Sequence, residues 1–126
     1  MVTMLPYEIK QEALRLRRTI EAISVGIWVT VSGLPKNEVS TRVVERRLLL
    51  LVAMVEDRRR LEAFRAARQA GRVYSETSDV LHGRTRASRF QTAHVEEWKA
   101  DVSRLNALWA PIRGLAANFD DHSESD

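Results

Sequence analysis

Apolar residues recur along both ends of this chain at the spacing of an α-helix. After Pro6, five of them follow one another at intervals of three and four and so share one helix face: Ile9, Ala13, Leu16, Ile20 and Ile23. A second series with the same intervals lies nearer the C-terminus: Val95, Trp98, Val102, Leu105 and Trp109. The two series predict two long helices. Pro6 suits the first turn of the first helix, and Thr92 suits the N-terminal cap of the second. Pro111 should end or kink the second helix at Ala110.

The continuation of the first series, residues 24–32, fits two structures. Alternate residues are β-branched, as in a strand, while the helical spacing continues through Ile27 and Val31. No other segment looks like a strand that could pair with it, and a lone strand leaves its backbone groups unsatisfied. We therefore predict that the segment is the buried end of the first helix, which stops at Gly33 to Pro35.

The longest apolar stretch lies in the middle, in the segment Val39–Gln69. It contains no glycine or proline, and five consecutive large aliphatic residues, Leu48 to Val52, occupy its centre. This composition predicts one long helix that starts near a cap at Asn37 and stops near Gly71. Because the apolar centre covers all sides of such a helix, neighbours are needed on several sides, and we predict a homodimer joined through helix faces.

A shorter polar element follows, Arg72–His82, closed by Gly83. Helical spacing places Tyr74, Ser78 and His82 on one of its faces, and Val73, Thr77 and Leu81 on the adjoining one. The next residues, 84–91, have no period and are predicted to form a loop with three arginines. The fold expected from all these elements is an all-α, antiparallel helical bundle of three long helices plus one or two short ones. Residues 1–119 form its single domain, and residues 120–126 are an acidic tail that we expect to be disordered.

Charge is distributed unevenly. The formal net charge is +3, but the last ten residues hold four acidic and no basic residues, so the rest of the chain carries +7. Arginines 58–60 add to a basic centre that is compatible with nucleic-acid contact. The alternative is a solvated helix face of ion pairs, since Glu56 and Arg60, and Arg58 and Glu62, are four residues apart.

The cluster of polar residues between Tyr74 and Arg89 supports two interpretations. His82 and Arg84 can be end-capping cations at a helix C-terminus. Alternatively, Tyr74, Ser78 and His82 line a groove with the loop arginines Arg84, Arg86 and Arg89 and bind phosphate or another anion.

Other sites are not predicted. The chain has no cysteine, and its three histidines are not spaced as a helical metal pair, so we expect no metal and no cofactor. The first residues match neither a signal peptide nor a membrane span, so we expect a cytoplasmic protein with no membrane contact.

The segment from Tyr74 through Ser78, Asp79, His82 and Gly83, placed before a last helix, resembles the HEPN helical-bundle superfamily. Many members of that superfamily are metal-independent ribonucleases or RNA-binding defence proteins. The resemblance implies a catalytic pair in Arg89 and His94, which have the superfamily's spacing at the start of a late helix and would be assembled across a dimer. The histidine would be the general acid/base, and the arginine would stabilise charge on the phosphate. Phe90 departs from the polar residue usual after the arginine.

Two functional hypotheses follow. In the first, the protein is a small interaction module that binds a partner protein or nucleic acid, RNA favoured, through its arginine-rich surface. Arg58, Arg59, Arg60, Tyr74, Ser78, His82, Arg84 and Arg86 are its binding residues, in a defence or toxin–antitoxin setting. In the second, the protein is a HEPN-like metal-independent endoribonuclease that uses Arg89 and His94.

Overall fold

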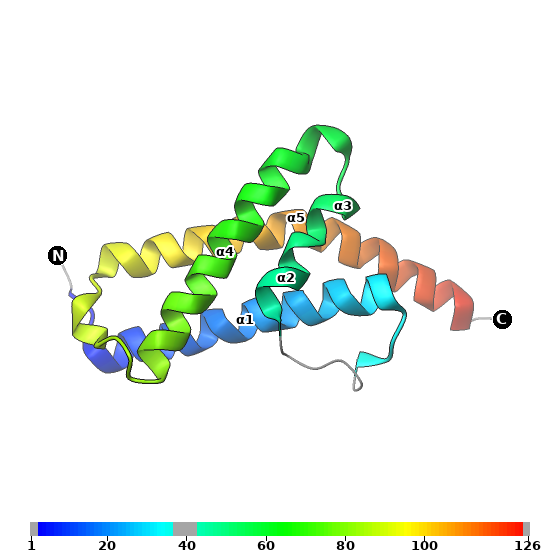
Figure 1. Cartoon of the computed structure of the whole chain (residues 1–126). Helices are drawn as coiled ribbons and strands as arrows, with labels where there is room; N and C mark the ends of the chain where they lie inside the picture. Colours follow the sequence, from blue (N-terminus) through cyan, green and yellow to red (C-terminus); the bar gives the residue numbers. More distant parts are fainter. Residues whose placement is uncertain (1–2, 37–42, 125–126) are drawn as a thin grey trace.

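The computed structural model describes residues 3–36 and 43–124, and all the regular elements in that part of the chain are helical (Figure 1). Three helices are long: α1 (Pro6–Ser32), α4 (Arg60–Leu81) and α5 (Thr92–Glu124). Two are short: α2 (Val44–Leu49) and α3 (Leu51–Met54). Two single 3₁₀ turns complete the set: η2 (Asp57–Arg59) and η3 (Ala87–Arg89). The prediction of an all-α bundle with three long helices and two short ones is confirmed.

Helices α1 and α5 lie side by side and run in the same direction, while α4 crosses both obliquely in the opposite sense (Figure 1). Successive long helices are therefore antiparallel. Helix α2 fills the space between α1 and α4 and contacts both. The beginnings of α1 and α5 are joined directly, because the backbone N–H of Met4 donates a hydrogen bond to Oγ1 of Thr92 at 3.2 Å.

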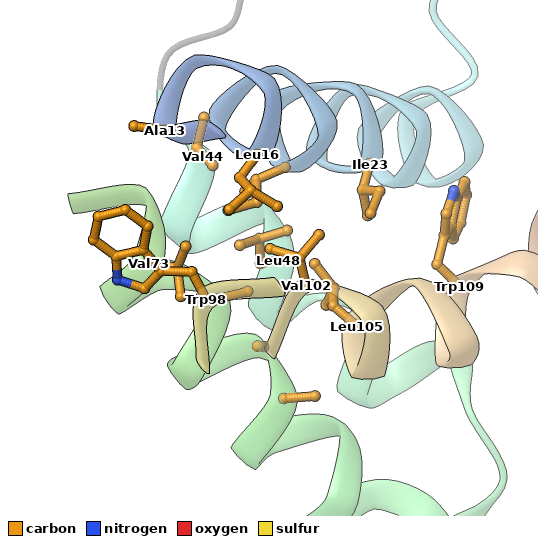
Figure 2. Packing of buried hydrophobic residues seen from close by; sticks show 14 of the residues in the cluster. Ala13, Leu16, Ile23, Val44, Leu48, Val73, Trp98, Val102, Leu105 and Trp109 are labelled. Carbon is orange, nitrogen blue, oxygen red and sulfur yellow. The ribbon is translucent and has the colours of Figure 1, made fainter. Parts of the chain in front are cut away.

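The core contains both apolar series that the sequence predicts. All five residues of the α1 series and all five of the α5 series are at most 5% exposed. Leu16 and Ile23 from α1 face Val102 and Leu105 from α5, with Leu48 between them (Figure 2). The three-and-four spacing thus identified the contact faces of both helices.

Helix α4 meets this core with small side chains. Ala63, Ala66, Ala67 and Ala70 are at most 3% exposed, and Val73 and Thr77 continue the same face. Alanine lets a crossing helix approach closely, since little side-chain volume separates the backbones. Of the predicted adjoining face of this segment, Val73 and Thr77 are buried and Leu81 is half-buried.

The ambiguous segment 24–32 is helical, as predicted. Helix α1 continues to Ser32, and Gly33 ends it in the left-handed conformation, with φ +73°, while its N–H donates to the carbonyl of Val29. Ile27 is fully buried, whereas Val31 is 50% exposed.

The prediction of one long central helix is wrong. Within Val39–Gln69 the chain bends at Leu50, leaves the helix at Val55 (φ −96°, ψ 164°), and begins α4 only at Arg60. A straight rod would carry the alanine face of α4 away from α1 and α5, so tertiary burial outweighs the local helix preference, which is worth a few tenths of a kcal/mol per residue. The predicted cap at Asn37 lies outside the described residues.

The break also changes the environment of the leucine run. Leu48 and Leu51 are fully buried, Leu50 and Val52 pack partly against the core, and Leu49 is 37% exposed. The apolar run is therefore covered largely by packing within the chain. The predicted homodimer would therefore have to form through the apolar residues that remain exposed. It stays a prediction.

Three predicted boundaries also differ. Gly71 does not end a helix, because α4 continues through it to Leu81. The predicted separate element Arg72–His82 is therefore the second half of α4 with its C-cap, His82. Pro111 does not end α5. It removes the donor to the carbonyl of Ala107, but both residues are exposed, so water can bind that carbonyl. Residues 120–124, expected to be a disordered tail, belong to α5, since no helix breaker follows Gly114.

Candidate interaction surfaces

A groove with a cavity volume of about 510 Å³ lies between the first half of α4 and the middle of α5. Three arginines line it, two from the α4 side and one from α5: Arg58, Arg65 and Arg104. Leu61 and Leu108 supply apolar surface, and Leu61 is 61% exposed. We call this hollow the α4–α5 groove. An apolar floor with charged groups on its walls can hold a ligand that carries both characters.

The three consecutive arginines at the start of α4 are all ion-paired. Arg58 binds Glu56 at 2.8 Å, Arg59 binds Glu62 at 3.2 Å, and Arg60 binds Asp57 at 2.9 Å. The expected pairs at i,i+4 do not form, because residues 56–59 are not α-helical and the i,i+4 geometry is absent there. The prediction of a solvated face with ion pairs therefore holds with different partners.

Among the described residues that line the α4–α5 groove, Glu62 is the only acidic one. The hydrogen bond that Arg59 donates lowers the pKa of the Glu62 carboxyl below its usual value, and the same bond raises the pKa of Arg59. Glu62 is therefore charged near neutral pH and already balanced by a cation outside the groove. Two of the groove arginines are paired in the same way with acids outside the groove, Arg58 with Glu56 and Arg104 with Asp101, so Arg65 is the groove arginine without an ion pair to a described residue.

Further along the exposed side of α4 the positive charge continues. Among the described residues, neither Arg65 nor Arg68 forms an ion pair, and the Arg68 guanidinium lies 5.9 Å above the centre of the Phe64 ring. Phe64 is 44% exposed. Leu61, Phe64, Arg65 and Arg68 are three or four residues apart and so adjoin on one helix surface.

At the other end of α4, Tyr74 faces α1 rather than an open groove, and Ser78 is half-buried. The Tyr74 hydroxyl donates to Oε1 of Glu21 at 3.2 Å, and the Arg17 guanidinium lies 5.4 Å from the centre of the Tyr74 ring. The Ser78 hydroxyl oxygen is buried without a hydrogen-bond partner. The contacts of Tyr74 join α4 to α1.

His82 is exposed and ends α4. Its Nδ1 lies 2.8 Å from the carbonyl oxygen of Ser78, which can only accept, so Nδ1 carries the proton. Gly83 then takes the left-handed conformation, as expected of a residue just past a helix end. This geometry matches the end-capping interpretation.

The loop arginines have different neighbours. Arg84 pairs with Asp79 at 3.4 Å, while Arg86 lines a small hollow of about 310 Å³ together with Lys10. Arg89 lies in η3 with an exposed side chain. With a rise of 1.5 Å per residue, the 22 residues of α4 separate this loop from Arg58–Arg60 by roughly 30 Å. The predicted binding residues thus form two surfaces.

His94 is exposed at the start of α5, as the resemblance places it. Its Nδ1 accepts a hydrogen bond from the backbone N–H of Gln91 at 3.1 Å, so the ring serves as a helix cap and its proton is on Nε2. The ring meets Phe90 edge-on at 5.7 Å, and Phe90 in turn packs on Trp98. Arg89 and His94 both face solvent, and the Nε2 atom alone remains for chemistry.

Sequence reasoning missed a buried polar network between α4 and α5. Asp101 is 4% exposed and binds Arg104 at 2.8 Å, with Arg72 at 3.7 Å. Nearby, the Trp98 indole N–H donates to Glu76 at 2.7 Å. The sequence did contain one indication of this buried acid, because Asp101 lies three residues after Trp98, within the apolar stripe of α5.

Among the residues that the structure describes, no group of three or more histidine, aspartate or glutamate side chains is placed to hold a metal ion. The described helices include none that is long and apolar enough to cross a bilayer.

The fold defines the class of this protein as an all-α helical bundle. No protein-family model, no curated protein and no solved structure matches the chain.

Proposed function

We infer that this protein is a small interaction module that binds single-stranded RNA through the α4–α5 groove and the adjoining exposed side of α4. The observation that carries the proposal is the groove itself, which combines Leu61 and Leu108 with three arginines, of which Arg65 forms no ion pair with a described residue and Arg58 forms only an exposed one. A defence or toxin–antitoxin setting remains part of the proposal on the sequence resemblance alone.

The charges support a polyanion as the ligand. Guanidinium groups bind phosphate oxygens through two parallel hydrogen bonds, and Arg65 has no competing carboxylate among the described residues. Arg58 is held only by Glu56, and their side chains are 81% and 68% exposed, so that pair is readily exchanged for a phosphate.

The apolar groups favour unpaired bases over a duplex. Phe64 offers an exposed ring next to the groove, and aromatic rings stack on bases of any sequence at about 1–3 kcal/mol per base. The Arg68 guanidinium over that ring adds a cation beside the stacking position. A duplex would hide its bases from Phe64, so we expect single strands to bind more tightly.

Two matched triple variants test the proposal. Arg58→Gln, Arg65→Gln and Arg68→Gln remove two charges at the α4–α5 groove and one on the adjoining exposed side of α4. Arg84→Gln, Arg86→Gln and Arg89→Gln remove three charges at the other end of α4. All six side chains are exposed, so both proteins should fold, which circular dichroism checks. Binding is measured by fluorescence anisotropy of a labelled single-stranded RNA over a series of salt concentrations.

We expect the groove variant to lose at least about tenfold in affinity, with a salt slope smaller in magnitude by roughly 2, and the loop variant to bind like the wild type. Equal losses in both variants would mean diffuse attraction without a groove. Absence of wild-type binding in low salt would exclude RNA and leave an acidic protein partner as the alternative.

A further inference from the structure

A second hollow, which we call the α1–α5 hollow, lies between the last turns of α1 and the second half of α5. It is separate from the arginine-rich surface. Its volume is about 480 Å³, which is in the range of small-molecule sites. Ala22, Ile23, Val25 and Val29 line it from α1, and Trp109 lines it from α5. Figure 2 shows Ile23 and the Trp109 indole extending toward each other from the two helices. Most of this surface is apolar.

Gly26 explains how the indole fits against α1. A Cβ atom at this position would lie 2.7 Å from Cζ2 of Trp109, so only glycine lets the ring approach the α1 backbone this closely. The ring is thereby fixed in place. Only the edge of this ring remains exposed, and with Ala22 and Val29 it gives the hollow an apolar lining that is suited to the apolar body of a ligand.

The indole also provides an unused donor. Trp109 is 3% exposed, and its Nε1–H forms no hydrogen bond to any of the described residues, whereas the Trp98 Nε1–H binds Glu76. This nitrogen is not among the fully buried side-chain atoms that lack a hydrogen-bond partner, so it keeps some contact with solvent. An acceptor group of a ligand can therefore reach it.

Two cations lie at the hollow, Lys36 just after α1 and Arg113 on α5. Neither forms an ion pair with a described residue, and none of the described residues that line the hollow is acidic. Asn106 adds an exposed amide. The hollow therefore combines an apolar interior with a positive edge.

From this arrangement we propose that the α1–α5 hollow binds an amphipathic organic anion, of the class of a medium-chain carboxylate. The apolar body lies against Ile23, Val29 and Trp109. The carboxylate is held by Lys36 and Arg113 and accepts the Nε1–H of Trp109. Charge complementarity selects this occupant over a neutral apolar molecule and over a cation.

Decanoate is a suitable probe, and decanol is the neutral control of the same length. Binding is followed by the three indole N–H signals in a nitrogen–proton correlation spectrum, assigned with Trp109→Phe. Decanoate should shift the Trp109 signal and leave that of Trp98 unchanged, because Glu76 already holds the latter. The double variant Lys36→Gln, Arg113→Gln should bind decanoate at least about tenfold more weakly. Both side chains are exposed, so the variant should fold.

Several results would overturn the proposal. Decanol binding as tightly as decanoate, or a double variant with full affinity, would show that the cations do not take part. A Trp109 signal that is unchanged at millimolar decanoate would show that the hollow does not take this class of ligand. A Trp109 signal that moves with protein concentration alone, together with a doubled mass in sedimentation, would assign the hollow to a second copy of the chain.

Discussion

Replacement of Gly71 by alanine distinguishes the observed fold from the fold that the sequence pattern suggests. Glycine near the end of an apolar stretch usually marks a helix terminus, where it takes a left-handed conformation. In the structure Gly71 lies inside α4, is buried, and does not have a positive φ. The two possibilities give opposite signs for the effect of Gly71→Ala.

The magnitude follows from two contributions. Alanine is more favourable than glycine in a helix interior by about 0.8–1 kcal/mol. The new Cβ would lie 3.4 Å from Cγ of Glu45, a contact with an exposed, flexible side chain that can move by a few tenths of an ångström. We therefore expect a net gain of about 0.5–1 kcal/mol, which raises Tm by roughly 2–6 °C in a domain of this size.

Thermal unfolding followed by far-ultraviolet circular dichroism measures the change, and two other glycines serve as controls. Gly33→Ala forces an alanine into φ +73° and should cost about 1–2 kcal/mol. Gly26→Ala places a Cβ 2.7 Å from Cζ2 of the buried Trp109, and the overpacking cost of about 1–3 kcal/mol should exceed the helix gain. A lower Tm for Gly71→Ala would refute a continuous α4.

Three further outcomes are expected. Asp101→Asn weakens the bond to Arg104 at a buried site and should lower the free energy of unfolding by about 1–3 kcal/mol, and an unchanged urea midpoint would contradict this. If two copies pair through the exposed Phe64, sedimentation at micromolar concentration gives twice 14.4 kDa and Phe64→Lys restores the monomer, whereas a wild-type monomer excludes the dimer. If the chain is a ribonuclease, His94→Ala should reduce RNA cleavage in EDTA about a hundredfold, and unchanged cleavage would remove the proposed site.

The sequence predicted helices α1 and α5 well because their apolar residues meet the same partners along their length. The spacing of the apolar residues was sufficient to identify both buried faces, from Ile9 to Ile23 and from Val95 to Trp109. The break between Leu50 and Arg60 was not predictable in this way. It has no glycine or proline, and its cause is the burial of alanines that lie later in the chain.

For the predicted binding residues, too, the sequence indicated some features and not others. Exposure and charge of Arg58, Arg59 and Arg60 could be inferred from sequence, but their partners depended on the 3₁₀ geometry at Asp57. Tyr74 and Ser78 are spaced as a polar face, yet Tyr74 is packed on α1, because Glu21 provides an acceptor that spacing within α4 does not reveal. Residues brought together from α1 and α5, such as Gly26 and Trp109, had no sequence signal as a pair.

The start of α4 extends past α1 and α5 (Figure 1), and its exposed Leu61 and Phe64 contribute little to the core. Helix ends with few buried contacts open locally at a lower free energy than the packed centre of a domain. The amide hydrogens of residues 60–65 should therefore exchange with solvent well before those around Ala70. The proposed RNA groove lies at this end of α4, so ligand binding would also stabilise the first turns of the helix and slow the exchange of their amide hydrogens.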